Sequence, residues 1–94
     1  MKLKDYPGIV SWPPMPGGAY SPGQKFPEND QSVVVTEVFP VVSEYVTFTC
    51  EFEGSQHTYD LQVEDIFTAK ELARILSENV GKSLDSFGVV PLEL

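Results

Sequence analysis

The chain has 94 residues, of which 41% are hydrophobic and 21% are charged. This length suffices for one small hydrophobic core, so we expect a single domain over residues 1–94. Fourteen acidic against six basic residues give a net charge of −8, which makes nucleic acids and anionic membranes poor partners. One cysteine and one histidine exclude an internal disulfide and a zinc site of the usual Cys/His type, and we expect no metal or cofactor.

The N-terminal residues carry no recognisable targeting signal. The first ten residues lack the apolar run of a signal peptide, and no stretch of the chain approaches the length of a membrane span. These features predict a soluble, cytoplasmic protein in a reducing environment.

Residues 1–28 are rich in proline and glycine. Six of the eight prolines fall within the first 27 residues, together with four of the seven glycines. Proline lacks a backbone donor and fixes φ, while glycine opens positive φ, so this segment suits neither a helix nor an interior strand. The composition predicts an irregular arm over residues 1–28, ahead of a folded body over residues 29–94.

The body begins with a β-branched segment over residues 32–39, which predicts a strand that Pro40 ends. Three consecutive valines, at 33–35, make both faces of that strand apolar near its start. Such a strand needs cover on both sides, and one helix can supply only one of them.

Two segments with alternating apolar and polar residues follow, over residues 45–53 and 57–64. The intervening Gly54-Ser55 favours a two-residue type II′ turn. That turn predicts a hairpin in which the inward residues pair as Phe52–His57, Cys50–Tyr59, Phe48–Leu61 and Val46–Val63.

A helix is predicted over residues 68–80, or from one turn earlier at Asp65. Thr68 and Glu71 have the spacing of a capping box, and Gly81 provides the C-terminal stop. The apolar stripe of this helix is Leu72, Ile75, Leu76 and Val80.

Residues 88–94 (GVVPLEL) alternate again and predict a last strand, which Pro91 restricts to an edge or to pairing on one side. The fold class is therefore α+β: an antiparallel β-meander in the order β-β-β-α-β with one helix packed on a face. Such a sheet could also curl into a small open barrel.

The arm has a distinctive order of residues: Ser11-Trp12-Pro13-Pro14, then Gly17-Gly18, Pro22-Gly23 and Phe26-Pro27. In this order the chain resembles a family of small, uncharacterised bacterial proteins. The resemblance implies the fold of that family and a bacterial, cytosolic setting. It implies no activity and assigns no functional residue. The chain departs from the pattern at Met15-Pro16, where a second aromatic residue is expected.

The arm also supplies the candidate binding residues: Trp12, Pro13, Pro14, Tyr20 and Phe26. The arm has three large aromatic rings in a segment without regular structure, and each ring that stays in water forgoes about 2–3 kcal/mol of burial free energy. We expect the arm to fold back onto the first strand or a sheet edge. The alternatives are a surface that docks another protein, including a P-x-x-P ligand at residues 13–16 without a nearby basic residue, and a disordered arm.

The residues able to carry chemistry are few. The predicted hairpin places His57 on its inner face and Asp60 on its outer face, which separates a base from its orienting acid. Cys50 lies inward, where burial makes a thiol unreactive. Glu51, Glu53, Asp60 and Glu64 project outward. Three interpretations of these carboxylates are open: a divalent-cation site, a mimic of nucleic-acid phosphates, and a solvated face that discourages aggregation between sheets. We favour the solvated face.

These observations favour a non-catalytic protein-interaction module that is monomeric or weakly dimeric, with an unidentified protein partner and no catalytic residue. The alternative is a small enzyme, or an enzyme subunit, with a site where the arm meets the sheet. In that case His57 or Tyr59 acts as acid or base, supported by Glu37 or Asp60. A chain with one small core rarely encloses a pocket of the size that enzymes use, which favours the module.

Overall fold

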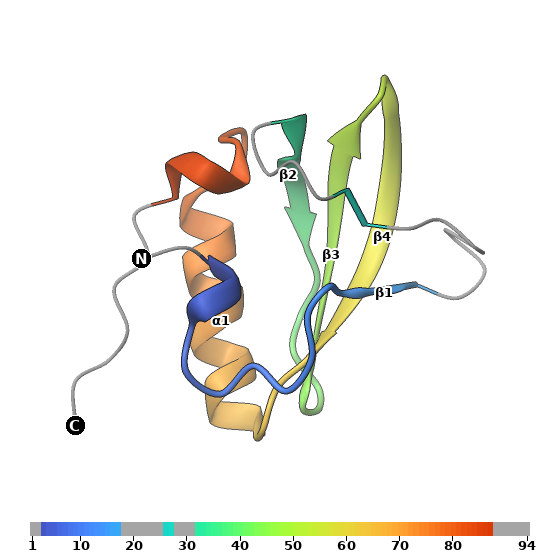
Figure 1. Cartoon of the computed structure of the whole chain (residues 1–94). Coiled ribbons are helices and arrows are strands. Elements are labelled where there is room, and N and C mark those ends of the chain that lie inside the picture. The colour runs from blue at the N-terminus through green and yellow to red at the C-terminus, as the bar shows by residue number, and fades with distance from the viewer. Residues whose placement is uncertain (1–2, 18–25, 28–31, 88–94) are drawn as a thin grey trace.

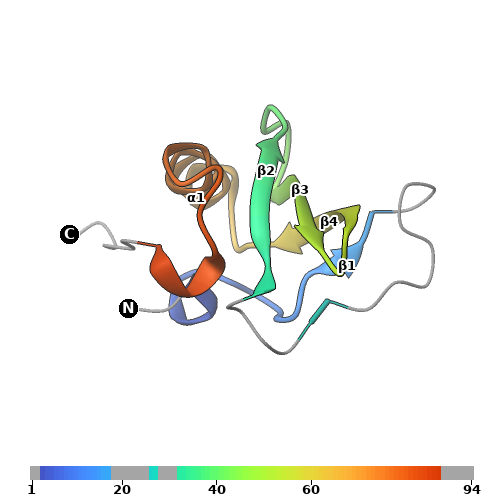
Figure 2. The same cartoon turned by 90° about the horizontal axis from the view of Figure 1, so that it is seen from above.

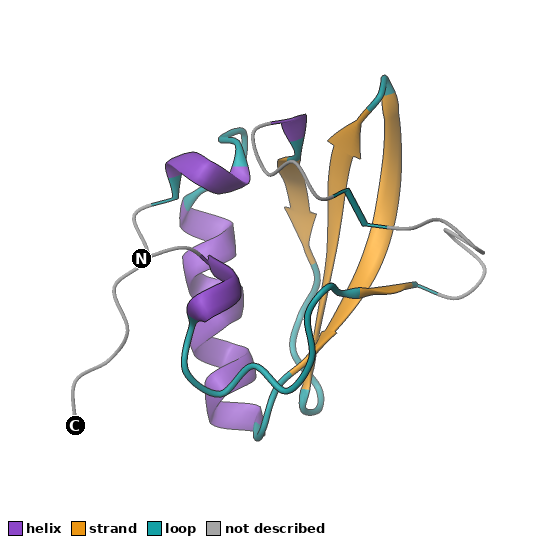
Figure 3. Cartoon of the chain, in the orientation of Figure 1, coloured by secondary structure: helices purple, strands orange, loops and turns teal. Residues whose placement is uncertain are grey.

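The computed structural model describes residues 3–17, 26–27 and 32–87. It shows a four-stranded antiparallel sheet with one helix packed against one face, which confirms the α+β class (Figure 1). The strand order is β1-β4-β3-β2, and the sheet is open, so no barrel forms. The elements, coloured by type in Figure 3, are η1 (Leu3–Asp5), β1 (Met15–Pro16), β2 (Val34–Val38), β3 (Tyr45–Phe52), β4 (Ser55–Gln62), α1 (Ile66–Glu78) and η4 (Leu84–Ser86).

The central hairpin of β3 and β4 forms as predicted, but in a different register. Phe52 lies opposite Ser55, Cys50 opposite His57, Phe48 opposite Tyr59 and Val46 opposite Leu61. The turn is therefore Glu53-Gly54, with positive φ at both residues, rather than Gly54-Ser55. All four predicted pairs are therefore wrong, because each β3 residue lies opposite a β4 residue two positions earlier than predicted. Because side chains alternate with a period of two, the predicted faces are nevertheless correct.

The Glu53-Gly54 turn gives a first testable prediction. Glu53 has φ 53°, a left-handed conformation that costs a residue with a Cβ about 1 kcal/mol and that asparagine tolerates better. Glu53→Asn is expected to raise the free energy of unfolding by about 0.5–1 kcal/mol in chemical denaturation. Glu51→Asn, in the strand, is the control and should not stabilise the protein. An unchanged or lower stability of Glu53→Asn would argue for the Gly54-Ser55 turn.

The chain after the helix lies along the free edge of the valine segment, which is a different position from the predicted cover on its two faces. Val33 and Val35 are fully buried, and Val34 is half-buried. The amide of Gly81 donates to the Val35 carbonyl at 2.8 Å, and the amide of Leu84 donates to the Val33 carbonyl at 2.9 Å. The segment after α1 therefore protects the first half of β2, which would otherwise be an open edge.

The arm covers the opposite edge of the sheet. Met15 and Pro16 of β1 pair with Asp60 and Tyr59 of β4, and the amide of Val10 donates to the Gln62 carbonyl at 3.0 Å. Seen from above, β1 lies at the edge of the sheet opposite β2 (Figure 2). The prediction of an irregular arm is thus wrong in part, because its residues include one helical turn, η1, and an edge strand. Pro16 is compatible with an edge position.

Helix α1 spans 66–78 rather than 68–80, and its start confirms the earlier of the two predicted N-termini, at Asp65. The N-cap is Asp65, whose carboxylate accepts from the Thr68 amide at 2.7 Å, so the capping box of Thr68 and Glu71 is wrong. Glu71 instead pairs with Arg74, which also pairs with Glu78. Val80 lies beyond the helix and is exposed, so it does not belong to the apolar stripe.

The Asp65 cap predicts a pH dependence. Hydrogen bonds from the Thr68 amide and hydroxyl hold the pKa of Asp65 below its ordinary value. A carboxyl whose pKa is lower in the folded state stabilises the protein at pH values above its unfolded-state pKa. This contribution is lost as the pH falls through the folded-state pKa. Asp65→Ala should therefore lower the melting temperature at pH 7 but much less at pH 2–3. Asp65→Asn, which still caps, should lower it less at pH 7. Equal melting temperatures for Asp65→Ala and the wild type at pH 7 would exclude this cap.

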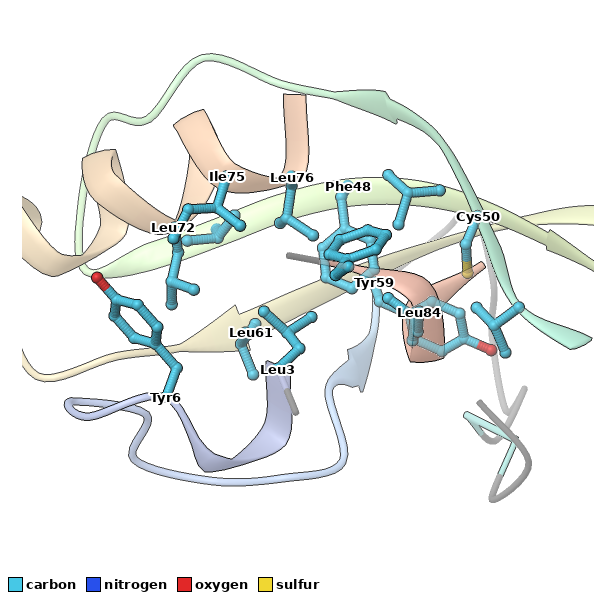
Figure 4. Close-up of a cluster of buried hydrophobic side chains, with 14 of the residues drawn as sticks. Leu3, Tyr6, Phe48, Cys50, Tyr59, Leu61, Leu72, Ile75, Leu76 and Leu84 are labelled. Carbon is cyan, nitrogen blue, oxygen red and sulfur yellow. The ribbon is translucent and has the colours of Figure 1, made fainter. Parts of the chain in front are cut away.

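The core lies between α1 and the inner face of the sheet. Leu72, Ile75 and Leu76 of α1 point towards Phe48, Tyr59 and Leu61 of the central strands (Figure 4). Leu3 of η1 and Leu84 of η4 join the same buried cluster from outside the two main layers. Residues near both ends of the described chain therefore contribute to one core.

Two predictions fall outside the described residues: the strand at 88–94 and the position of Tyr20. Among the residues that are described, no helix is both long enough and apolar enough to cross a membrane.

Candidate functional site

The structure places four of the five candidate arm residues. Phe26 is buried and meets Tyr59 edge-on, with 5.0 Å between ring centroids. Trp12 is half-buried and meets Phe26 edge-on at 5.4 Å. Pro14 is buried and Pro13 is exposed. The described aromatic residues of the arm therefore pack on the body, and docking through Trp12 and Pro13 stays a prediction.

The residues of the alternative, enzymatic site lie on opposite faces of the sheet. His57 is half-exposed on the inner face and stacks on Phe52, with 4.3 Å between centroids. Asp60 lies on the outer face, where its carboxylate accepts from the Thr47 hydroxyl at 2.6 Å. Glu37 lies on β2, opposite Thr49, and β3 separates that strand from β4, which carries His57. Neither of the two predicted supporting acids therefore lies beside His57.

The remaining acid–base candidate, Tyr59, and the single thiol, Cys50, are both interior. Tyr59 is fully buried, and burial together with the neighbouring Cys50 raises its pKa to about 12. Burial alone raises the pKa of the Cys50 thiol to about 12. The thiolate is the nucleophilic form of cysteine, and it is scarcely populated at neutral pH with such a pKa. Cys50 is therefore a core residue.

The outer face of the sheet is polar and carries paired side chains. The hydroxyls of Thr49 and Thr58 lie 3.3 Å apart, and the Thr36 hydroxyl donates to the Thr49 carbonyl at 3.1 Å. Within the described part of the chain, no three His, Cys, Asp or Glu side chains gather closely enough to hold a metal ion.

A feature that sequence reasoning missed is a groove of about 370 Å³ beside the helix. One wall is the end of β2 and the chain that follows it, and the other is one face of α1. We call it the α1 groove; its lining residues are Val38, Phe39, Pro40, Val41, Lys70, Ala73 and Ser77. Because β1 and β2 occupy opposite edges of the sheet, the groove lies at the edge away from the arm.

Further exposed apolar residues lie near the lining residues of the α1 groove in the chain. Val42 follows its wall and is 86% exposed. Ile66 is exposed one turn before Lys70, on the same side of α1, and the neighbouring Phe67 is 78% exposed. With Phe39, these make four of the seven large apolar side chains that are exposed among the described residues. In the sequence, Phe67 directly precedes the predicted helix start at Thr68, and an apolar residue there is the one local signal for this surface.

Comparison with protein-family models, with curated proteins and with solved structures found no match for this chain. The resemblance of the arm to a bacterial family accordingly stays an expectation.

Proposed function

We propose that the protein is a non-catalytic interaction module that binds another protein through the α1 groove. The observation that carries the proposal is the apolar lining of this groove, which includes the exposed Phe39. Three more exposed apolar residues are near its lining residues in the chain: Val42, Ile66 and Phe67. Soluble monomers rarely expose large contiguous apolar patches, and those they do expose often mark interfaces.

The floor of the α1 groove supports this proposal. Val38, Val41 and Ala73 line the groove and also pack against the buried core, so the surface rests on a rigid base. A partner that covers it would bury apolar area without reorganising the fold, which lowers the cost of binding. The separation of His57 from Asp60 favours binding over catalysis.

The test compares two double variants in affinity purification from the native host, followed by mass spectrometry. Val42→Ser/Phe67→Ser changes the proposed surface, and Val10→Ser/Val80→Ser changes two exposed valines elsewhere. The free energy of unfolding of both variants should lie within about 0.5 kcal/mol of that of the wild type, because all four side chains are exposed. A partner should be recovered with the wild type and the control but at least tenfold less with Val42→Ser/Phe67→Ser. Recovery of the same proteins in equal amounts with both variants would refute the proposal.

A further inference from the structure

The α1 groove contains one positively charged side chain, Lys70. Four basic residues are described, and Lys70 alone among them lines the groove. Arg74, one turn further along α1, is held by Glu71 and Glu78. Lys70 is exposed and forms no ion pair with any described residue. The groove therefore presents an unpaired ammonium at an apolar surface, on a chain whose net charge is −8.

The dimensions of the surface indicate an elongated occupant. Lys70 and Ser77 are seven residues apart on α1, or about 10 Å at 1.5 Å per residue, and Ile66 extends this face to about 16 Å. An extended peptide advances about 3.3 Å per residue, so about five residues match the face. Of the two polar side chains in the lining, Ser77 already donates its hydroxyl proton to the Ala73 carbonyl, so Lys70 is the donor available to a ligand.

From this arrangement we infer that the α1 groove binds a short apolar peptide segment of a partner protein that carries a single carboxylate, which pairs with Lys70. The inference rests on the proposed function and adds the chemistry of the partner. Apolar side chains of the peptide cover Val38, Val41 and Ala73, and the carboxylate neutralises the ammonium. One carboxylate fits better than an acidic run, because the net charge of −8 repels a strongly acidic segment.

Three pools of capped hexapeptides provide the probe. Each pool is randomised over valine, leucine, isoleucine, proline and serine, with one fixed position that is glutamate, glutamine or lysine. Amide chemical shifts of the ¹⁵N-labelled protein report binding, with shifts expected at Val41, Lys70 and Ala73. The glutamate pool should bind about two- to fivefold more tightly than the glutamine pool, as a partly exposed ion pair predicts, and the lysine pool should bind most weakly.

Two lysine variants isolate the ion pair. Lys70→Gln should abolish the preference for the glutamate pool over the glutamine pool, whereas Lys82→Gln, an exposed lysine outside the groove, should keep it. Equal binding of all three pools would overturn the inference about the carboxylate. Absence of shifts at the groove with every pool would overturn the inference of a peptide ligand. Neither result decides the proposed function, which the comparison of Val42→Ser/Phe67→Ser with its control tests separately.

Discussion

Replacing Tyr59 by alanine is expected to lower the free energy of unfolding by about 3–5 kcal/mol. Tyr59 is fully buried in β4, and its ring lies 5.0 Å from that of Phe26, 6.2 Å from Phe52 and 6.4 Å from Phe48. Removing the ring leaves a cavity between the arm and the sheet that neighbouring rings cannot fill without leaving their own contacts.

Chemical denaturation followed by circular dichroism measures the loss. Tyr45→Ala is the control, because Tyr45 is half-buried on the outer face, and we expect it to cost about 1 kcal/mol. Tyr59→Phe retains the ring and should cost about 1 kcal/mol, so it remains measurable if the alanine variant does not fold. A loss below about 1 kcal/mol for Tyr59→Ala would mean that Tyr59 does not occupy the centre of the core.

The second large effect is expected at Phe26, which joins the arm to the body. Phe26 is buried, and its ring contacts those of Trp12 and Tyr59. Phe26→Ala should lower the free energy of unfolding by about 3 kcal/mol. It should also loosen the arm, because the ring against which Trp12 packs is lost.

Amide hydrogen exchange distinguishes loosening of the arm from general destabilisation. The amides of Val10 and Gly17 donate to carbonyls of β4, and both should exchange faster in Phe26→Ala than the global loss of stability explains. The matched control is Phe67→Ala, because Phe67 is 78% exposed and should change stability by less than about 0.5 kcal/mol. Unchanged exchange at Val10 and Gly17 would show that Phe26 does not hold the arm.

Side-chain alternation predicted the faces of the hairpin but not its register. The pattern places Phe48, Cys50 and Tyr59 inward, and all three are fully buried. Turns at Gly54-Ser55 and at Glu53-Gly54 both keep those faces, because the two registers differ by two residues. Local turn chemistry favours glycine first, and the structure instead places Glu53 in a left-handed conformation.

The ends of the helix and the edges of the sheet were harder to predict, since they depend on tertiary contacts. Asp65 and Thr68 are both reasonable N-caps, and the sequence alone does not decide between them. The pairing of the arm with β4 and of residues 81–84 with β2 joins segments that are distant in the chain and carry no local pairing signal. The α1 groove escaped prediction for the same reason, because its two walls are about 30 residues apart.

We propose that the arm stabilises the fold while the α1 groove binds the partner, and Trp12→Ala distinguishes these two roles. Its unfolding free energy and its recovery of the partner are measured side by side with those of Val42→Ser/Phe67→Ser. Because the half-buried Trp12 ring packs on Phe26, the variant should lose about 1–2 kcal/mol of stability and retain the partner. Val42→Ser/Phe67→Ser should keep its stability and lose the partner. Loss of the partner from Trp12→Ala at unchanged stability would contradict this account and place the docking surface on the arm.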